Sequence, residues 1–381
     1  MNIIKKEGKL YFYESYWRIN KEDHDRDSFG NLFPYPKQHD NIWSGQEQFL
    51  EQLKNIENDL EINKLKESRI KSCLICKKNI NNGNYELSDF IWEDGLKHYI
   101  MKHNIKPSDE FIEFIYTYKS SKNIHNKRII KYNSETYVVH DIKHIKINKN
   151  QLMIIDALLR HGGYNKKYID KKNKKIYRYS EHAGLLDFNK NGVNKIIISG
   201  KTERVDIGDE EIFLPKNIPD AFDYEYIFHT HPPTPKPGGR VTIGILYEFP
   251  SISDILHFID HYNGGLTQGS LVFAAEGMYN IRKHKFDRNK IKIDEDKMNE
   301  ELQELYPTVQ EEAIEQYGTT FNTSFFYEKI AQNNKYINKI NKILNNYELH
   351  IDYYPRSKDL NGKWILFDLY LPIYITEHKN K

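Results

Sequence analysis

The sequence predicts an α+β protein whose main domain is a mixed β-sheet flanked by helices. The first observation is that strand-like and helix-like runs are interspersed between about residues 135 and 290. The second is that helical segments follow this region and strand-like segments close the chain. The third is the supply of 28 tyrosines and 19 phenylalanines among 381 residues, which provides large side chains for a core. Together these features argue against a disordered chain.

The formal net charge is only +2, which argues against a global polyanion-binding surface but leaves a local one open. The N-terminus lacks an apolar signal region, and no run approaches the roughly 20 apolar residues of a membrane span. We therefore expect a cytoplasmic or nuclear protein that is not secreted and has no membrane partner. Recurrent Asn, Lys, Ile and Tyr indicate an AT-rich genome, such as that of a large DNA virus or a protist. A viral protein would act in the host cytoplasm or the virion.

Two segments are expected before the main domain. Residues 1–68 predict a strand in LYFYESYWRI, a loop rich in Gly and Pro, and a helix from near Ser44 to Lys66. Residues 69–120 carry a Cys-x-x-Cys, a turn at NNGN and two short helices. Ser88 and Ser108 are suitable N-caps for these helices.

Residues 135–290 contain the elements of the main domain. TYVVHDIKHIKI predicts a strand, and KNQLMIIDALLRHGG predicts a helix that ends in glycine. Three more strands follow, in KIYRYSEHAGLLDF, VNKIIISGKTE and AFDYEYIFHTH. A helix then begins at Ser251, and a hairpin turns at Glu276 and Gly277. Residues 291–381 predict two helices and a terminal β-hairpin formed by YELHIDYY and KWILFDLYL.

The stretch FHTHPP indicates a metal site. Side chains two residues apart on a strand point to the same face, so His229 and His231 should lie side by side. The prolines that follow end the strand and leave both histidines at its rim. A catalytic zinc site usually takes three protein ligands and keeps a fourth position for water. A third ligand is therefore needed.

Asp254 can supply this ligand from the first turn of the helix at Ser251. The pattern Ser-x-x-Asp is also that of a capping box, and taken alone it favours the cap. The two roles are compatible, because a carboxylate at a helix start can also bind a metal. Hydrolysis further requires a general base. Glu181 in SEHAGLL is a candidate, although an isolated glutamate is more often a surface residue.

In this order, Glu-x-x-Gly-x-Leu, His-x-His-Pro and Pro-Ser-x-x-Asp resemble the JAMM motif of the MPN metalloproteases. The likeness extends from the helix QLMIIDALLRHGG to the hairpin LVFAAEGMYNIRK, less than half of the chain. The resemblance implies an MPN core with Glu181 as general base and with His229, His231 and Asp254 as ligands of a catalytic zinc. It also implies that Ser251 supports the oxyanion. The implied reaction is zinc-assisted hydrolysis of an isopeptide bond.

One departure from the family pattern is the length of the segment between the second histidine and the serine. Nineteen residues, 232–250, intervene, many more than the family usually has. This insertion could contact substrate through Arg240 and Tyr247, lie over the site as a lid, or be a tolerated surface loop. His257 and His261 share the helical face of Asp254, and a solvated polar face is favoured there over partners of the ligands.

A second candidate metal site lies near the N-terminus. The pair Cys73 and Cys76 is followed, after twenty-one residues, by His98 and His103. Both short spacings fit structural zinc, so a zinc-finger-like segment is expected. The alternative is buried thiols with surface histidines. A thioredoxin-like redox pair is disfavoured, because no βαβ pattern surrounds the cysteines.

Three functions are open to such a chain. The favoured one is a JAMM-type isopeptidase, a deubiquitinase that acts on ubiquitin or ubiquitin-like conjugates. A non-catalytic MPN scaffold is disfavoured because all five motif positions are intact. A nucleic-acid-associated finger protein is the third, but Glu93 and Asp94 stand where a base-reading helix would carry Arg, Asn or Gln. The finger is therefore expected to be structural or to bind other proteins.

Overall fold

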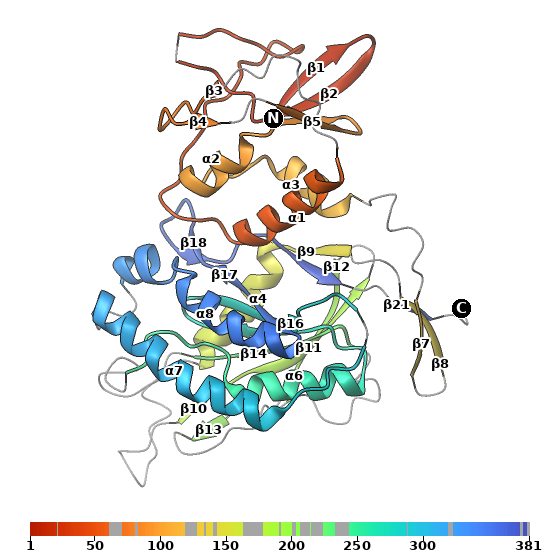
Figure 1. Ribbon diagram of the computed structural model, residues 1–381, viewed down its shortest axis with the longest axis vertical. Coiled ribbons are helices and arrows are strands. Elements are labelled where there is room, and N and C mark those ends of the chain that lie inside the picture. The colour runs from red at the N-terminus through yellow and green to blue at the C-terminus, as the bar shows by residue number, and fades with distance from the viewer. Residues whose placement is uncertain are drawn as a thin grey trace. The chain divides into compact units, whose positions relative to one another are not determined.

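The computed structural model of the chain forms two compact units, Met1–Ile124 and His125–Lys381 (Figure 1). The segments expected separately at 1–68 and 69–120 share the first unit, and those at 135–290 and 291–381 share the second. The structure describes residues 1–20, 22–60, 71–80, 83–118, 128–132, 135–139, 143–162, 178–189, 192–199, 203–205, 214, 224–232, 244–287, 289–318, 323–373 and 376–378.

The first unit combines a four-stranded sheet with helices. The sheet has the order β1-β2-β6-β5, and β2 runs parallel to β6. Aromatic rings fill the space between sheet and helices: the ring of Phe111 lies 6.3 Å from that of Phe49 and 5.3 Å from that of Trp92. The elements are β1 Asn2–Lys6, β2 Lys9–Glu14, α1 Gln46–Asp59, β3 Lys71–Ser72, β4 Asn79–Ile80, β5 Asn84–Leu87, β6 Phe90–Glu93, α2 Leu96–His103 and α3 Asp109–Thr117.

The two predicted N-caps of this unit have different outcomes. Ser108 caps α3, because its Oγ accepts a hydrogen bond from the N–H of Phe111 at 3.3 Å. The prediction for Ser88 is wrong. Ser88 lies between β5 and β6 with a φ of 56°, and α2 begins only after Gly95. The predicted end of the first helix, near Lys66, lies outside the described residues.

A six-stranded mixed sheet forms the centre of the second unit, which confirms the predicted α+β class at this coarse level. Its order is β12-β11-β14-β15-β16-β17. β14 and β15 are parallel, and the other neighbours in the sheet are antiparallel. The strands are β11 Ala183–Asn189, β12 Gly192–Ile198, β14 Tyr226–Thr230, β15 Gly269–Phe273, β16 Gly277–Lys283 and β17 Leu349–Pro355.

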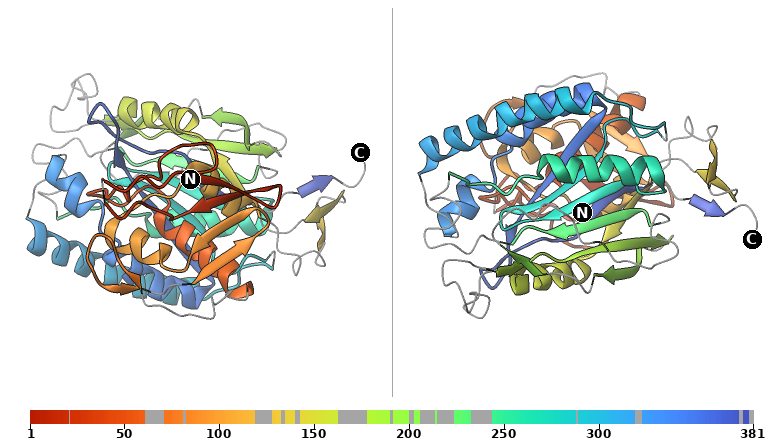
Figure 2. Two further views of the ribbon diagram at one scale, coloured as in Figure 1. Left: turned by 90° about the horizontal axis from the view of Figure 1, so that it is seen from above. Right: turned by 90° about the horizontal axis from the view of Figure 1, so that it is seen from below.

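Helices cover both faces of this sheet, and α6 lies across one of them (Figure 2). α6, α7 and α8 pack on one face, against Val272, Tyr279 and Ile351. α4 packs on the other face, against a core that includes Phe228 and Phe273. Neighbouring residues on a strand point to opposite faces, so β14 presents its histidine on the α6 side. The helices are α4 Lys149–Gly162, α6 Ile252–Gly264, α7 Glu295–Tyr317, α8 Lys335–Leu344, and the short η3 Phe326–Ile330 and η4 Asn345–Tyr347.

The two strands predicted as a terminal hairpin pair elsewhere. β17 pairs with β16 and completes the large sheet, whereas β20 pairs with β9. Ile351 and Tyr353 of β17 are buried in the core under α8, which an isolated two-stranded hairpin could not provide. No helix in the described part of the chain is long and apolar enough to span a membrane. The remaining strands are β7 Arg128–Tyr132, β8 Glu135–Val139, β9 Lys143–Ile147, β10 Arg178–Ser180, β13 Glu203–Val205, β18 Ser357–Lys358, β19 Trp364–Ile365, β20 Leu369–Ile373 and β21 Thr376–His378.

A buried ion pair ties α4 to the end of β17. Two guanidinium nitrogens of Arg356 lie 2.5 and 2.8 Å from the carboxylate oxygens of Asp156, and both side chains are 5% exposed.

We expect Asp156→Ala to lower the free energy of unfolding by about 3–5 kcal/mol, because the guanidinium would stay buried without its carboxylate. Chemical denaturation followed by fluorescence measures this loss. Asp156→Leu combined with Arg356→Met should recover part of it, and no recovery would contradict the electrostatic explanation.

Candidate metal centres

Strand β14 positions the first two candidate ligands. His229 is 2% exposed and pairs with Ala183 in the neighbouring strand β11. His231 follows directly after β14, and its N–H donates to the carbonyl of Phe273 at 2.8 Å. Both imidazoles therefore project from the α6 side of the sheet, as the spacing of two residues predicted.

Asp254 reaches the histidines from the first turn of α6. Its carboxylate oxygens lie 3.1 Å from Nε2 of His229 and 3.3 Å from Nε2 of His231, and the two Nε2 atoms are 3.0 Å apart. The same carboxylate accepts a hydrogen bond from the N–H of Ser251 at 2.7 Å, and the Ser251 Oγ accepts one from the N–H of Asp254 at 3.1 Å. The capping box predicted from the Ser-x-x-Asp pattern is thus formed, and the same carboxylate lies beside both histidines.

This His2Asp group could hold a metal ion. A tetrahedral zinc ion has bonds of about 2.0–2.2 Å to nitrogen and oxygen, which places its ligand atoms roughly 3.3–3.6 Å apart. The observed separations of 3.0–3.3 Å are close to this range without any rearrangement of the backbone. The donor set, two imidazoles and one carboxylate, is one that zinc commonly uses.

The charges of the group are strongly coupled. Burial alone would raise the pKa of Asp254, but the two histidines outweigh it and hold this pKa well below its usual range. Burial alone would lower the pKa of His231, but Asp254 outweighs it and, with Glu181 and Glu248, raises this pKa to about 10. A metal ion that binds neutral His231 must therefore displace a proton.

Glu181 lies close enough to His231 to act on its charge. Ala183 pairs with His229. The N–H of Thr230 donates to the carbonyl of His182 at 2.9 Å, so the antiparallel pairing continues to the residue before β11. If the same register continued for one more residue, Glu181 would stand opposite His231, on the face that carries both histidines. Its carboxylate is also one of the charges that raise the pKa of His231. Glu181 thus lies just before β11, in a two-residue connection after β10, and not within the strand as predicted.

Of the insertion 232–250, the structure describes Pro232 and residues 244–250. Arg240 lies outside the described residues, so the structure does not test its predicted contact with substrate. Tyr247 is 2% exposed and its hydroxyl donates to the carbonyl of Ile330 at 2.8 Å. Tyr247 therefore packs inside the protein, which disfavours the alternative in which its side chain contacts substrate. Ser251 itself is exposed at the start of α6.

The surroundings of four side chains near this group differ from those expected from the sequence, or were not expected at all. His257 and His261 are half-buried, with ring centroids 4.6 Å apart, and do not form a solvated face. Glu248 contributes to the raised pKa of His231, although only its place three residues before Ser251 could have drawn attention to it. Tyr306 lies near Asp254, since burial and then the charge of Asp254 raise the pKa of its phenol. No local pattern indicates a contact across fifty residues.

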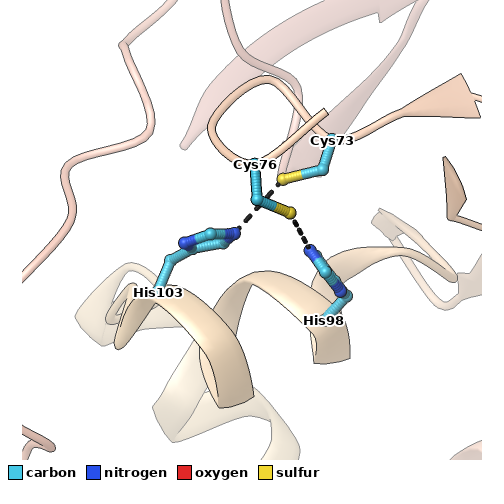
Figure 3. A group of neighbouring side chains, drawn as sticks. All are labelled: Cys73, Cys76, His98 and His103. Carbon is cyan, nitrogen blue, oxygen red and sulfur yellow. Dashed lines mark hydrogen bonds between the residues drawn. The ribbon is translucent and has the colours of Figure 1, made fainter. Parts of the chain in front are cut away.

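The second predicted cluster is also assembled (Figure 3). The Sγ of Cys73 lies 3.3 Å from Nε2 of His103, and the Sγ of Cys76 lies 3.3 Å from Nε2 of His98. The four ligand atoms all lie within 4.8 Å of one another and could hold a metal ion. Two thiolates and two imidazoles around a closed site are typical of structural zinc.

A tight turn and a helix supply these ligands. Both cysteines lie in the turn between β3 and β4, where the Cys73 N–H donates to the carbonyl of Lys78 at 2.8 Å. Both histidines lie on α2, and Tyr99 between them accepts a hydrogen bond from the N–H of Leu74 at 2.9 Å. A hydrogen bond from the main chain of Lys78 lowers the pKa of Cys76. Burial lowers the pKa of each histidine, and both effects favour the protonation states that bind metal.

Comparison with known proteins found one informative relative. An uncharacterized protein of Acanthamoeba polyphaga mimivirus is 35% identical to this chain over 303 residues, which cover 78% of this chain and 84% of the viral protein. This relative supports a viral origin, one of the two sources that the composition indicated. No family model matches the chain, and no solved structure matches it.

The two clusters predict two zinc sites per protein chain, each of which binds its ion independently of the other. We expect the purified protein to bind two zinc ions, and His229→Ala and Cys73→Ser to bind one each, because each substitution removes a ligand from only one cluster. Elemental analysis after gel filtration measures the ratio of zinc to protein. Retention of two equivalents by His229→Ala would contradict the assignment of a site to His229, His231 and Asp254.

The proton on His231 predicts the pH dependence of the first site. Because the pKa of this imidazole is about 10 without metal, it is protonated below that pH, and each metal ion bound releases one proton. The apparent zinc affinity of the His2Asp group should therefore rise about tenfold per pH unit between pH 6 and 8. Competition with a chelator, corrected for its own protonation and compared with His229→Ala, isolates this site. A pH-independent affinity would contradict the coupling between His231 and Asp254.

Proposed function

We propose that this chain, which belongs to the same family as the mimivirus protein, is a zinc-dependent isopeptidase of JAMM type that removes ubiquitin or a ubiquitin-like modifier. The relative is uncharacterized, so the proposal depends on the chemistry of the site. One observation carries it: His229, His231 and Asp254 converge from a strand and a helix, and the charge of Glu181 acts on His231. A scaffold needs no carboxylate at that position.

Each of the remaining side chains then has a role in amide hydrolysis. A zinc ion held by the His2Asp group would supply a Lewis acid and lower the pKa of the water that it binds. Glu181 takes a proton from the attacking water and returns it to the departing amine. The hydroxyl of Ser251 accepts from the Asp254 N–H and keeps its own proton to donate to the carbonyl oxygen as charge develops there. Neither cysteine takes part in this chemistry.

The Cys2His2 cluster is proposed to hold a structural zinc. Its ligands come from a tight turn and a helix, and Tyr99 and Ile80 pack around the buried Cys73. Glu93 and Asp94, before α2, lie within 3.6 Å of Lys71 and Lys97 respectively, so they are engaged in ion pairs. This arrangement favours a stabilising or protein-binding role over the reading of bases.

Two other functions remain as alternatives. A non-catalytic MPN scaffold would also use this fold, and it would tolerate replacement of Glu181. A nucleic-acid-associated protein would use the finger, and its retention on DNA would fall steeply as salt rises. Cleavage of conjugates distinguishes the proposed enzyme from both.

Replacement of Glu181 tests the proposal directly. We expect Glu181→Gln to abolish turnover, because the amide cannot take up the proton of the attacking water, while zinc stays bound. The measurement is cleavage of a panel of di-ubiquitins and of conjugates of other modifiers, with zinc content determined in parallel. His229→Ala is the matched control, which should lose both activity and the zinc of this site. Full activity of Glu181→Gln would refute the mechanism.

If the wild-type protein binds zinc but cleaves no conjugate in the panel, the isopeptidase proposal fails and the scaffold is favoured. Cleavage that a zinc chelator and Glu181→Gln both remove would establish the enzyme. The pattern of cleaved linkages would then define its substrate.

A further inference from the structure

The segment Leu246–Pro250, here called the delivery loop, leads directly into the cap of α6. Its last residue precedes Ser251, whose main chain and side chain form the capping box with Asp254. The path of the delivery loop therefore determines where α6 starts and where the carboxylate of Asp254 points. The loop has no helical or strand structure of its own.

Gln310 of α7 holds the first part of the delivery loop. Its Oε1 accepts hydrogen bonds from the N–H groups of Leu246 and Tyr247 at 2.8 and 3.1 Å. Its Nε2 donates to the carbonyl of Tyr247 at 2.7 Å. One side-chain amide thus satisfies three main-chain groups that are more than sixty residues away in the sequence. Such a set of contacts fixes the loop as a strand partner would.

Two further side chains hold the rest of the delivery loop. The hydroxyl of Tyr306, one turn earlier on α7, donates to the carbonyl of Pro250 at 2.8 Å. The carboxylate of Glu276, in the turn between β15 and β16, accepts from the N–H of Glu248 at 2.5 Å. The ring of Phe249 is stacked on that of Tyr306, with centroids 6.4 Å apart, and meets that of Tyr279 edge-on, with centroids 5.9 Å apart.

We propose that Gln310 and Tyr306 are positioning residues of the His2Asp metal centre, which act on Asp254 through the delivery loop. Neither touches a metal ligand through a hydrogen bond that the structure records, and both lie on α7, outside the segment that resembles the JAMM motif. Helix α7 is therefore part of the machinery of the site. For activity the inference rests on the proposed function, whereas for metal affinity it stands independently.

The physical reason is the strict geometry of metal binding. A zinc ion requires its ligand atoms at fixed distances, and groups that orient ligands typically contribute 10- to 100-fold to metal affinity or activity. His229 is fixed by the β-sheet, but Asp254 depends on where α6 begins. Without Gln310, three main-chain groups of the delivery loop lose their partners, and the loop gains alternative conformations that carry Asp254 away from the histidines.

The test uses the full chain and four proteins: the wild type, Gln310→Met, Tyr306→Phe and the control Gln303→Met. Methionine matches glutamine in shape but makes none of the three hydrogen bonds. Gln303 is exposed on the same helix, and its amide contacts Asn299 of that helix, so the control repeats the substitution away from the loop. The probe is zinc alone. The readout is the chelator concentration at which zinc leaves the His2Asp group, and His229→Ala, which lacks this zinc, identifies its signal. Thermal unfolding of each protein checks that it is folded.

We expect Gln310→Met to release this zinc at a chelator concentration about tenfold or more below that of the wild type, and Tyr306→Phe to show a smaller shift in the same direction. Gln303→Met should match the wild type. If conjugates are cleaved, kcat should fall in both variants while KM is unchanged, because neither residue reaches the substrate. If no conjugate is cleaved, the proposed function fails but the zinc shift still decides this inference.

Two results would overturn the inference. In the first, Gln310→Met and Tyr306→Phe both hold zinc as the wild type does. In the second, Gln303→Met weakens binding as much as Gln310→Met, which would mean that the effect is general destabilisation of α7. Should Gln310→Met fail to fold, Tyr306→Phe decides alone, since it removes a single hydroxyl and keeps the aromatic ring in its stack.

Discussion

The candidate catalytic centre depends on the contact of the Asp254 carboxylate with His229 and His231. This carboxylate closes the first turn of α6 and lies against both imidazoles at the rim of β14. A buried carboxylate is costly unless it is paired, and here two histidines and a main-chain N–H compensate for its burial. Helix and sheet are thereby joined at the same point at which a metal ion would bind. Any change that moves α6 along the sheet changes the site.

The candidate ligands could be predicted from sequence because each depends on a local rule. The period of two on a strand placed His229 and His231 on one face, and the capping pattern placed Asp254 at a helix start. The spacings of two cysteines and two histidines predicted the second cluster. The failures also have local causes: Ser88 has a suitable side chain for a cap, but its left-handed backbone belongs to a turn between strands.

Contacts between distant segments could not be predicted in this way. Nothing near Leu246 in the sequence indicates that Gln310 will bind its main chain, and nothing in the last strands indicates that β17 joins β16 and not its neighbour in sequence. The buried position of Tyr247 could not be foreseen for the same reason, since its partner Ile330 lies more than eighty residues away. Side-chain to main-chain bonds of this kind follow from tertiary packing, and no spacing rule describes them. The resemblance to the JAMM family likewise depends on a few site positions, and no family model matches the chain.

The pairing of β17 with β16 has a consequence for how this protein can be divided. All seven residues of β16 are buried, and β17 covers their outer edge along the whole length of the strand. A shortened protein that ended after the motif-bearing region would leave the main-chain groups along this edge of β16 unpaired, and such an edge is where sheets recruit other chains and aggregate. The smallest fragment that can be expressed or fused as a folded unit must therefore include β17. The five motif positions do not define it.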